Sequence, residues 1–222
     1  DFVANVSHEL RTPVSVIRAN AETLLDGALD DQAAARSFTT AIHRNSERLT
    51  MLLSDLLDLA RMEAGETPLN PTTVMLHHSV ERAFDMLGLA AEQRGVTLHN
   101  EIPNGLQVHT DPDTFDQVLL NLIGNGIKYG QSSGGRVWVR GFGESECIRI
   151  EIIDDGPGIE QRHRDRVFER FYRVDPGRSR DMGGTGLGLA IVKHLVDLMG
   201  GTVGIRPRDG GGTIFWLTLP VG

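Results

Sequence analysis

Two runs of apolar residues that repeat every seven residues constrain the fold most strongly. The first run consists of Val3, Leu10, Ile17 and Leu24, and the second of Ile42, Leu49 and Leu56. Seven-residue spacing is typical of helices that pack side by side in bundles. The segment at 26–31, which contains acidic residues and a glycine, separates the two runs and indicates a turn. The sequence therefore predicts a helical hairpin, which we assign to residues 1–65.

A hairpin of this size cannot build a good hydrophobic core from its own residues. Its two apolar seams have no other predicted partner within the hairpin. We therefore expect two copies of the chain to associate as a four-helix bundle, so that the protein is a homodimer.

The pattern changes after the second helix. Gly, Pro and Thr concentrate in the run EAGETPLNPTT at 63–73, and we predict a linker at 66–73. Helices are expected at 74–93, 112–129 and 186–199. Between them lie six segments of strand character, VTLHNEI, LQVHT, RVWVRGF, CIRIEII, TVGIRP and GTIFWLTL. Helices gathered on one side of a mixed sheet form an α/β sandwich, so the fold class is α+β with a second domain at 74–222.

Composition narrows the choice of partners. The formal net charge of -8, from 30 acidic and 22 basic residues, argues against nucleic-acid binding. A single cysteine, Cys147, excludes an internal disulfide and fits a reducing compartment. No apolar run approaches the roughly 20 residues that span a bilayer. The chain begins at Asp1 without an initiator Met, and we expect it to be a fragment of a longer protein.

His8 is the first candidate for chemistry. It lies about 200° around the helix from Leu10, so it points away from the bundle core. Glu9 could polarise or deprotonate the imidazole, whose unperturbed pKa of about 6.5 keeps a neutral, nucleophilic nitrogen near neutral pH. Thr12 shares the His8 face and could orient a water or a phosphoryl group, while Pro13 removes a helical donor one turn later. A solvated surface histidine is the alternative interpretation.

The segment FVANVSHELRTPVSVI at 2–17 resembles the phospho-acceptor box of bacterial sensor histidine kinases, including its H-E-x-x-T-P core. LLDLARMEAG at 56–65 is similar to the end of the second dimerisation helix in that family. Nucleotide-binding boxes follow in the family order, so the resemblance covers nearly the whole chain. It implies a Bergerat-type ATP-binding fold for the second domain.

The first nucleotide box is DQVLLNLIGNGIKYG at 116–130, where a helix places Asn121, Asn125 and Lys128 on one face. The resemblance implies that Asn125 supplies an amide oxygen to Mg²⁺ and that Asn121 supports the phosphate site. It also implies that Lys128 neutralises phosphate and that Tyr129 lines the nucleotide. An amide oxygen is a suitable hard ligand for Mg²⁺.

The second box, IEIIDDGPGI at 150–159, runs from a strand into a glycine-containing turn. The resemblance implies that Asp154 accepts a hydrogen bond from the adenine amino group. Gly156 and Gly158 would allow the backbone to approach closely. Asp155 stands at a variable position of the box and receives no role.

RVFERFYRVD at 166–175 resembles the aromatic box that opens the ATP lid, and it implies that Arg173 reaches the terminal phosphates. The next segment is polar, as a mobile lid should be. It contains Arg178 and Arg180, which we expect either to clamp phosphate or to be ordinary surface arginines.

The last box is GGTGLGLAIVKHLVDLMGG at 183–201, whose glycines expose backbone N–H groups at the start of a helix. The predicted nucleotide contacts are Gly184, Thr185, Gly186, Leu187 and Gly188. A Walker A loop is excluded because Leu189 and Ala190 stand where Lys and Ser or Thr are required.

The resemblance implies ATP-dependent autophosphorylation of His8 and phosphotransfer to an aspartate in a response-regulator receiver domain. It also implies a regulator phosphatase activity that uses Thr12. ATP and Mg²⁺ would be the cofactors, and the chain would be the cytoplasmic portion of a protein of the bacterial inner membrane.

The sequence has two alternative functional interpretations. One is an ATP hydrolase of the same superfamily, which is disfavoured because Asn121 stands where those enzymes carry a water-activating Glu. The other is a non-catalytic dimerisation or binding module, which would predict broken boxes, and none is broken.

Overall fold

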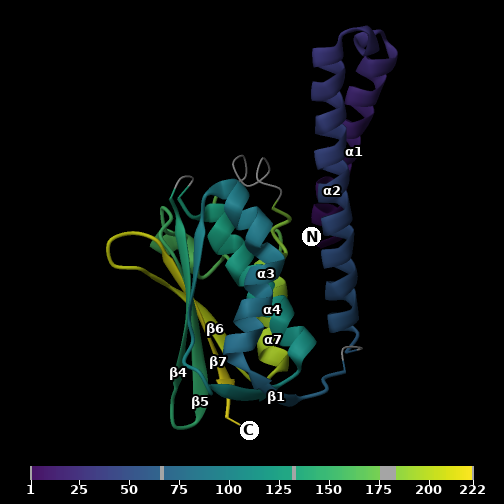
Figure 1. Cartoon of the computed structure of the whole chain (residues 1–222). Helices are drawn as coiled ribbons and strands as arrows, with labels where there is room; N and C mark the ends of the chain where they lie inside the picture. The colour runs from purple at the N-terminus through teal and green to yellow at the C-terminus, as the bar shows by residue number, and fades with distance from the viewer. Residues whose placement is uncertain (1, 66–67, 132–133, 176–183, 222) are drawn as a thin grey trace.

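The structure is a computed structural model that describes residues 2–65, 68–131, 134–175 and 184–221. Figure 1 shows a long two-helix arm beside an α/β unit. The arm consists of α1 (Phe2–Leu25), the short 3₁₀ helix η1 (Ala28–Asp30) and α2 (Gln32–Glu63). This confirms the predicted hairpin and places its turn within the predicted segment 26–31.

Local chemistry explains the turn between α1 and α2. Gly27 has a φ of 116°, a conformation that glycine adopts without a steric penalty. Asp31 caps α2, because its side chain accepts hydrogen bonds from the N–H groups of Ala33 and Ala34. Within α1 the helix continues through Pro13, although proline cannot donate the usual backbone hydrogen bond there.

The α/β unit is built on a five-stranded sheet with the strand order β2-β4-β5-β7-β6. Its strands are β2 (Thr97–Glu101), β4 (Arg136–Gly143), β5 (Cys147–Asp154), β6 (Thr202–Pro207) and β7 (Thr213–Pro220). β2 and β4 run parallel, and the other neighbours run antiparallel. The predicted mixed sheet is therefore confirmed.

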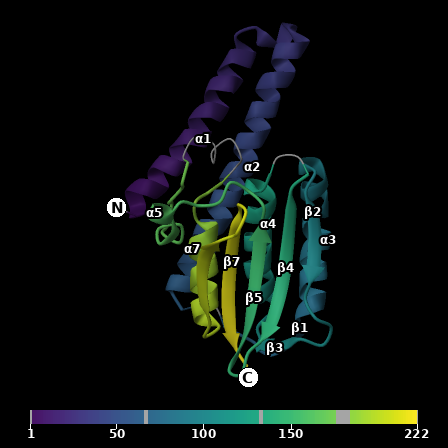
Figure 2. The ribbon, with the colours of Figure 1, turned by 90° about the vertical axis from the view of Figure 1, so that its left-hand side faces the viewer.

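Helices cover one face of this sheet, the face nearer the hairpin (Figures 1 and 2). They are α3 (Leu76–Arg94), α4 (Pro112–Tyr129) and α7 (Gly188–Leu198), and the short α5 (Gln161–Arg164) lies near the start of α1. The opposite face of the sheet carries no helix in the described part of the chain.

The start of the second domain differs from the prediction. Residues 72–73 were predicted as linker and residues 74–75 as helix, but together they form β1 (Thr72–Met75). β1 pairs antiparallel with β3 (Gln107–Thr110) in a separate two-stranded ribbon, so the LQVHT segment lies outside the main sheet. Val74 is buried in the core of the α/β unit, and this burial together with the pairing stabilises a strand in a segment of weak local pattern.

The main core lies between the sheet and its three helices. Fully buried members include Leu119, Leu122 and Ile123 of α4, Val137 and Val139 of β4, Ile150 of β5 and Leu217 of β7.

The hairpin is different, since several of its large hydrophobic side chains are exposed. These are Phe2, Val3, Val14, Leu25, Leu29, Met51, Leu53 and Leu57. Among the described residues, no helix has the length and apolarity that crossing a membrane requires.

Candidate functional site

His8 is presented to solvent at the contact between the hairpin and the α/β unit. Its side chain is 64% exposed, as the helix geometry predicted, and its Nδ1 lies 3.9 Å from Glu9 Oε1. His8 lines a cavity of about 310 Å³ together with Asn5 and Glu9. The opposite wall of this cavity comes from the α/β unit and consists of Arg166, Glu169, Arg170, Phe171 and Tyr172. The imidazole therefore faces the segment predicted to open the ATP lid.

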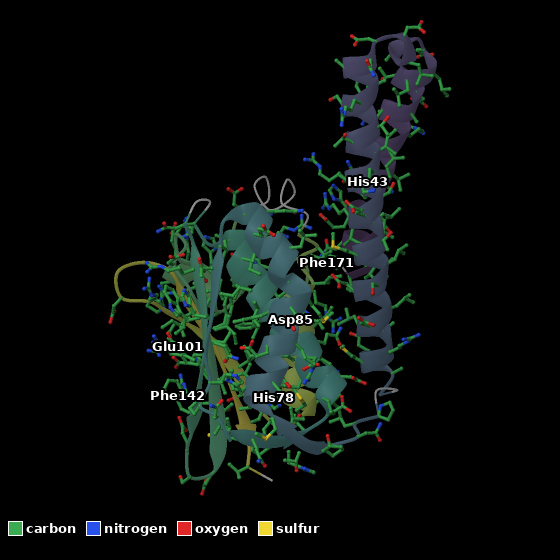
Figure 3. All side chains as sticks on the ribbon, viewed as in Figure 1. His43, His78, Asp85, Glu101, Phe142 and Phe171 are labelled. Carbon is green, nitrogen blue, oxygen red and sulfur yellow. The ribbon has the colours of Figure 1, made fainter. Side chains whose placement is uncertain are left out.

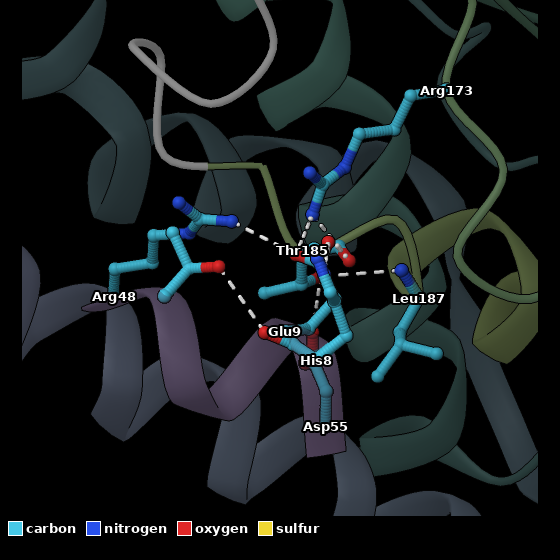
Figure 4. Close-up of polar contacts among 8 residues, drawn as sticks. His8, Glu9, Arg48, Asp55, Arg173, Thr185 and Leu187 are labelled. Carbon is cyan, nitrogen blue, oxygen red and sulfur yellow. Dashed lines mark hydrogen bonds and ion pairs between the residues drawn. The ribbon is translucent and has the colours of Figure 1, made fainter. Parts of the chain in front are cut away.

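Glu9 joins both helices of the hairpin to the α/β unit. Its Oε2 accepts hydrogen bonds from Arg48 of α2 at 2.9 Å and from Arg173 at 2.8 Å (Figure 4). Both guanidinium side chains are buried. Buried charges require partners, so this carboxylate and its two arginines form a fixed ionic contact.

Thr12 lies one helical turn beyond His8. Its Oγ1 donates to the backbone carbonyl of His8 at 3.2 Å, a bond that helical threonines commonly make. The hydroxyl therefore lies on the His8 face of α1, where the sequence placed it.

Phe171 lies where the lid-opening segment contacts the hairpin (Figure 3). Its ring packs on Phe2 of α1, with centroids 5.8 Å apart. Its φ of 63° is uncommon for a residue other than glycine, and its N–H donates to the carbonyl of Gly186 at 2.8 Å. This bond ties the segment before the lid to the segment after it. Arg178 and Arg180, the predicted clamps, lie outside the described residues.

Asn121, Asn125, Lys128 and Tyr129 all lie on α4. Asn121 Nδ2 donates to the carbonyl of Gln117 at 3.0 Å. Its Oδ1 reaches the start of α7, where a Cβ on Gly188 would lie only 2.7 Å away. Gly188 therefore lets the predicted phosphate-supporting amide meet the N-terminus of α7.

Lys128 lies among other cations. Burial, followed by the nearby positive charges of Arg94, Arg173 and Arg48, lowers the pKa of its ammonium group from 10.5 to about 8. Asp55 of α2 acts in the opposite direction. A half-buried lysine near three arginines creates a locally positive region in an otherwise acidic chain.

Asp154 ends β5 and is buried. Its Oδ1 accepts hydrogen bonds from the N–H groups of Gly156 at 2.9 Å and Thr213 at 3.2 Å. Burial raises the pKa of its carboxyl group from 3.8 to about 6, although these hydrogen bonds act to lower it. Such pKa shifts are common at binding sites, where burial and neighbouring groups are arranged around a ligand.

The glycines after Asp154 create space for close contact. A Cβ on Gly156 would lie 2.5 Å from the carbonyl oxygen of Tyr129, and Gly158 has a φ of 77°. Asp155, for which no role was predicted, is buried and accepts the N–H of Arg136 at 3.0 Å. It fixes this loop to β4.

Thr185 connects the predicted phosphate segment to the hairpin. Its Oγ1 donates to Asp55 Oδ2 at 2.6 Å and accepts from the N–H of Leu187 at 3.2 Å. Its carbonyl accepts from Arg173 at 2.9 Å. Gly184 precedes it, and Gly186 follows with a φ of 78°. Thr185, Arg173 and Glu9 thus meet at one contact, whereas Asp154 and Gly156 lie in a second group with Tyr129.

Two family models match the chain. The His Kinase A (phospho-acceptor) domain matches residues 1–65, and the family of histidine kinase-, DNA gyrase B-, and HSP90-like ATPases matches residues 110–222. The chain belongs to the sensor histidine kinases.

Relatives of this histidine kinase match it nearly end to end. It is 36% identical to the sensor histidine kinase WalK of Bacillus subtilis over 221 residues, which are 99% of the chain and 36% of WalK. It is 38% identical to the sensor-like histidine kinase SenX3 of Mycobacterium tuberculosis over 220 residues, which are 99% of the chain and 53% of SenX3. The chain therefore spans between a third and about half of the length of these relatives.

A solved structure shares the whole fold. Histidine kinase AdeS from Acinetobacter baumannii matches with a TM-score of 0.78 at 25% identity, over 97% of this chain and 98% of that chain.

Two polar residues of this histidine kinase escaped prediction, Arg48 and Asp55. Both lie on α2 and contact predicted site residues, Glu9 and Thr185 respectively. In the sequence, both residues look like ordinary polar residues between the apolar positions of a bundle helix. No local signal in the sequence distinguishes them.

Proposed function

We propose that this chain is the catalytic core of a kinase that transfers the γ-phosphoryl group of ATP to His8. The phosphohistidine then donates its phosphoryl group to an aspartate in a response-regulator receiver domain. The observation that carries this proposal is the contact at Glu9, which joins the phospho-acceptor helix to Arg173 of the ATPase-type domain.

The residues around Arg173 fit a triphosphate. The Nε of Arg173 is buried and finds no acceptor among the residues that the structure describes. A buried donor without an acceptor is costly, and a phosphate oxygen would satisfy it. Lys128 and the start of α7 supply further positive charge at the same site.

Mg²⁺ would be held through Asn125 and the phosphates. The described residues contain no group of three His, Cys, Asp or Glu side chains that could hold a metal. Mg²⁺ keeps waters and substrate phosphates in its shell, so one amide ligand from the protein suffices. The ion would neutralise the phosphates during transfer.

The 3.9 Å between His8 Nδ1 and Glu9 Oε1 supports separate proposed roles for the two nitrogens of the ring. Nδ1 is the nitrogen nearer Glu9, so the distal Nε2 attacks phosphorus. The new P–N bond forms as the bond to the ADP oxygen breaks, and ADP leaves. Glu9 stabilises the positive charge that develops on the ring and receives the Nδ1 proton as the step completes. Positioning and charge neutralisation supply most of the catalysis.

The proposal includes the partners of the whole protein. Two hairpins form the dimer through their exposed apolar side chains. The chain acts as the cytoplasmic portion of a sensor at the bacterial inner membrane.

Thr12 orients a water that removes phosphate from the regulator. Slower dephosphorylation by Thr12→Ala than by Thr23→Ala would support this role, because Thr23 makes the same helical back-bond to Ala19. Equal rates would exclude it.

Labelling with γ-labelled ATP and Mg²⁺ tests the proposed function. The label should be acid-labile and alkali-stable, because a phosphoramidate carries it, and His8→Gln should abolish it. His43→Gln is a matched control, since His43 is also exposed and lies 3.4 Å from an acid, Glu47. Undiminished labelling of His8→Gln would overturn the assignment.

A further inference from the structure

Asp55 of α2 places a negative charge where the proposed function expects an anion to bind. Its Oδ2 accepts the hydroxyl of Thr185 at 2.6 Å, within the segment predicted to bind phosphate (Figure 4). Two like charges at one site repel each other. A carboxylate here therefore opposes nucleotide binding, and its presence calls for an explanation.

Asp55 also lies close enough to Lys128 for their charges to interact. Lys128 and Asp55 influence each other, since Asp55 acts to raise the pKa of Lys128 and Lys128 acts to lower that of Asp55. Burial is the largest influence on Asp55 and raises its pKa, with the Thr185 hydrogen bond acting against it and Asp58 adding to it. The carboxylate thus shares its surroundings with the lysine assigned to phosphate.

Other acids of α2 dock differently. Asp58 accepts from Gln117 Nε2 at 3.0 Å, and Glu63 pairs with Arg170. Neither Gln117 nor Arg170 has a role toward nucleotide. Of these three acids, Asp55 is the one whose partner belongs to the predicted phosphate site.

Arg173 likewise binds a carboxylate of the hairpin, although the proposed function assigns it to the nucleotide. One of its terminal nitrogens donates both to Glu9 of the hairpin and to the carbonyl of Thr185. Two carboxylates of the hairpin, Glu9 and Asp55, therefore occupy two groups that the proposed function assigns to the nucleotide. The same surface of the α/β unit cannot give these groups fully to both partners.

We propose that Asp55 is a positioning residue that substitutes for a nucleotide phosphate at Thr185. Its carboxylate holds the hairpin against the α/β unit until ATP takes over Thr185, and ATP binding then loosens this contact. The inference rests on the proposed function, because it needs a triphosphate at this site. Linkage makes the effect reciprocal, so Asp55 lowers the affinity for ATP by the factor by which ATP weakens the docking.

Calorimetry of the full chain with Mg²⁺ and the non-hydrolysable analogue AMP-PNP tests this inference. Asp55→Asn keeps an oxygen that can accept from Thr185 but removes the charge, so the analogue should bind about tenfold more tightly. Asp55→Glu restores the charge and should remain within about threefold of wild type. Glu47→Gln, at an exposed position of the same helix that pairs only with His43 among the contacts described above, should not change the affinity.

Hydrogen exchange supplies a second readout that a merely structural role would not produce. AMP-PNP should accelerate amide exchange in α2 around residues 52–62 of the wild type, and less so in Asp55→Asn, where the docking is already weaker. Unchanged or weaker binding by Asp55→Asn would overturn the inference while leaving the proposed function intact. A wild type that binds no AMP-PNP would overturn both.

Discussion

The hairpin and the α/β domain are each incomplete, but in different respects. The hairpin leaves large hydrophobic side chains exposed along its length, while its buried charges at Glu9 are paired. The α/β domain encloses a large core, yet it holds Asp154 with a pKa near 6 and Lys128 with a pKa near 8. Exposed apolar surface is covered by another apolar surface, whereas a buried carboxylate is satisfied by a hydrogen-bond donor of a ligand and a buried ammonium group by an anion. The proposed function assigns a second hairpin to one region and a nucleotide to the other.

Truncation of the enclosed core should have the largest effect. Leu122 is fully buried in α4, so Leu122→Ala should reduce the free energy of unfolding by about 3 to 4 kcal/mol through lost contacts and a cavity. Urea unfolding followed by circular dichroism measures it. Leu89→Ala is the matched control, because Leu89 of α3 is 68% exposed and should cost less than about 0.5 kcal/mol. Equal losses would show that α4 does not form the core.

The unfavourable charge of Asp154 should appear as a pH-dependent stability. Because its folded pKa of about 6 lies above the ordinary value of 3.8, its protonated form favours folding. This contribution is complete below pH 3.8 and is lost as the pH rises through 6. Asp154→Asn should therefore be roughly 2 kcal/mol more stable than wild type at pH 8 and no more stable near pH 4.

The same Asp154→Asn variant should bind AMP-PNP more weakly, since an amide donor replaces part of the acceptor for the adenine amino group. Thermal unfolding at both pH values and calorimetry measure the two effects. A gain in stability that is equal at pH 4 and pH 8 would contradict the role of charge.

The exposed surface of the hairpin should show the smallest of these effects, and only in association. Leu57 is 60% exposed on α2, so Leu57→Ala should raise the dissociation constant of the dimer by about tenfold while leaving AMP-PNP affinity unchanged. Sedimentation equilibrium measures the change. Leu89→Ala removes an equally exposed leucine from the other region and should leave the dimer intact. Similar effects of both variants would remove the distinction between the two surfaces.

Much of the fold could be predicted because its signals are local. The helix expected at 112–129 matches α4 at both ends, where Asp111 caps the start and Pro112 opens the first turn. β1 was missed because its strand depends on β3, more than thirty residues later, while Pro and Gly nearby indicated a linker. Pairing between distant segments leaves little trace in local composition.

The same limit applies to the site. Asn121, Asp154 and Thr185 belong to compact motifs, so a resemblance could identify them. Asp55 acquires its contact only when Thr185, 130 residues later, packs against α2. Arg48 likewise depends on its contact with Glu9, 39 residues earlier. Their roles follow from how two regions dock, which no short pattern records.

The ribbon of β1 and β3 also limits how far the α/β domain can move along the hairpin, because β1 ends the linker that follows α2. Eight residues, 64–71, separate the end of α2 from β1, and even fully extended they span no more than about 28 Å. α2 has 32 residues and measures about 48 Å. β1 can therefore move only part of the way along α2 from its C-terminal end. The end of the hairpin around η1 therefore lies beyond the reach of β1 itself.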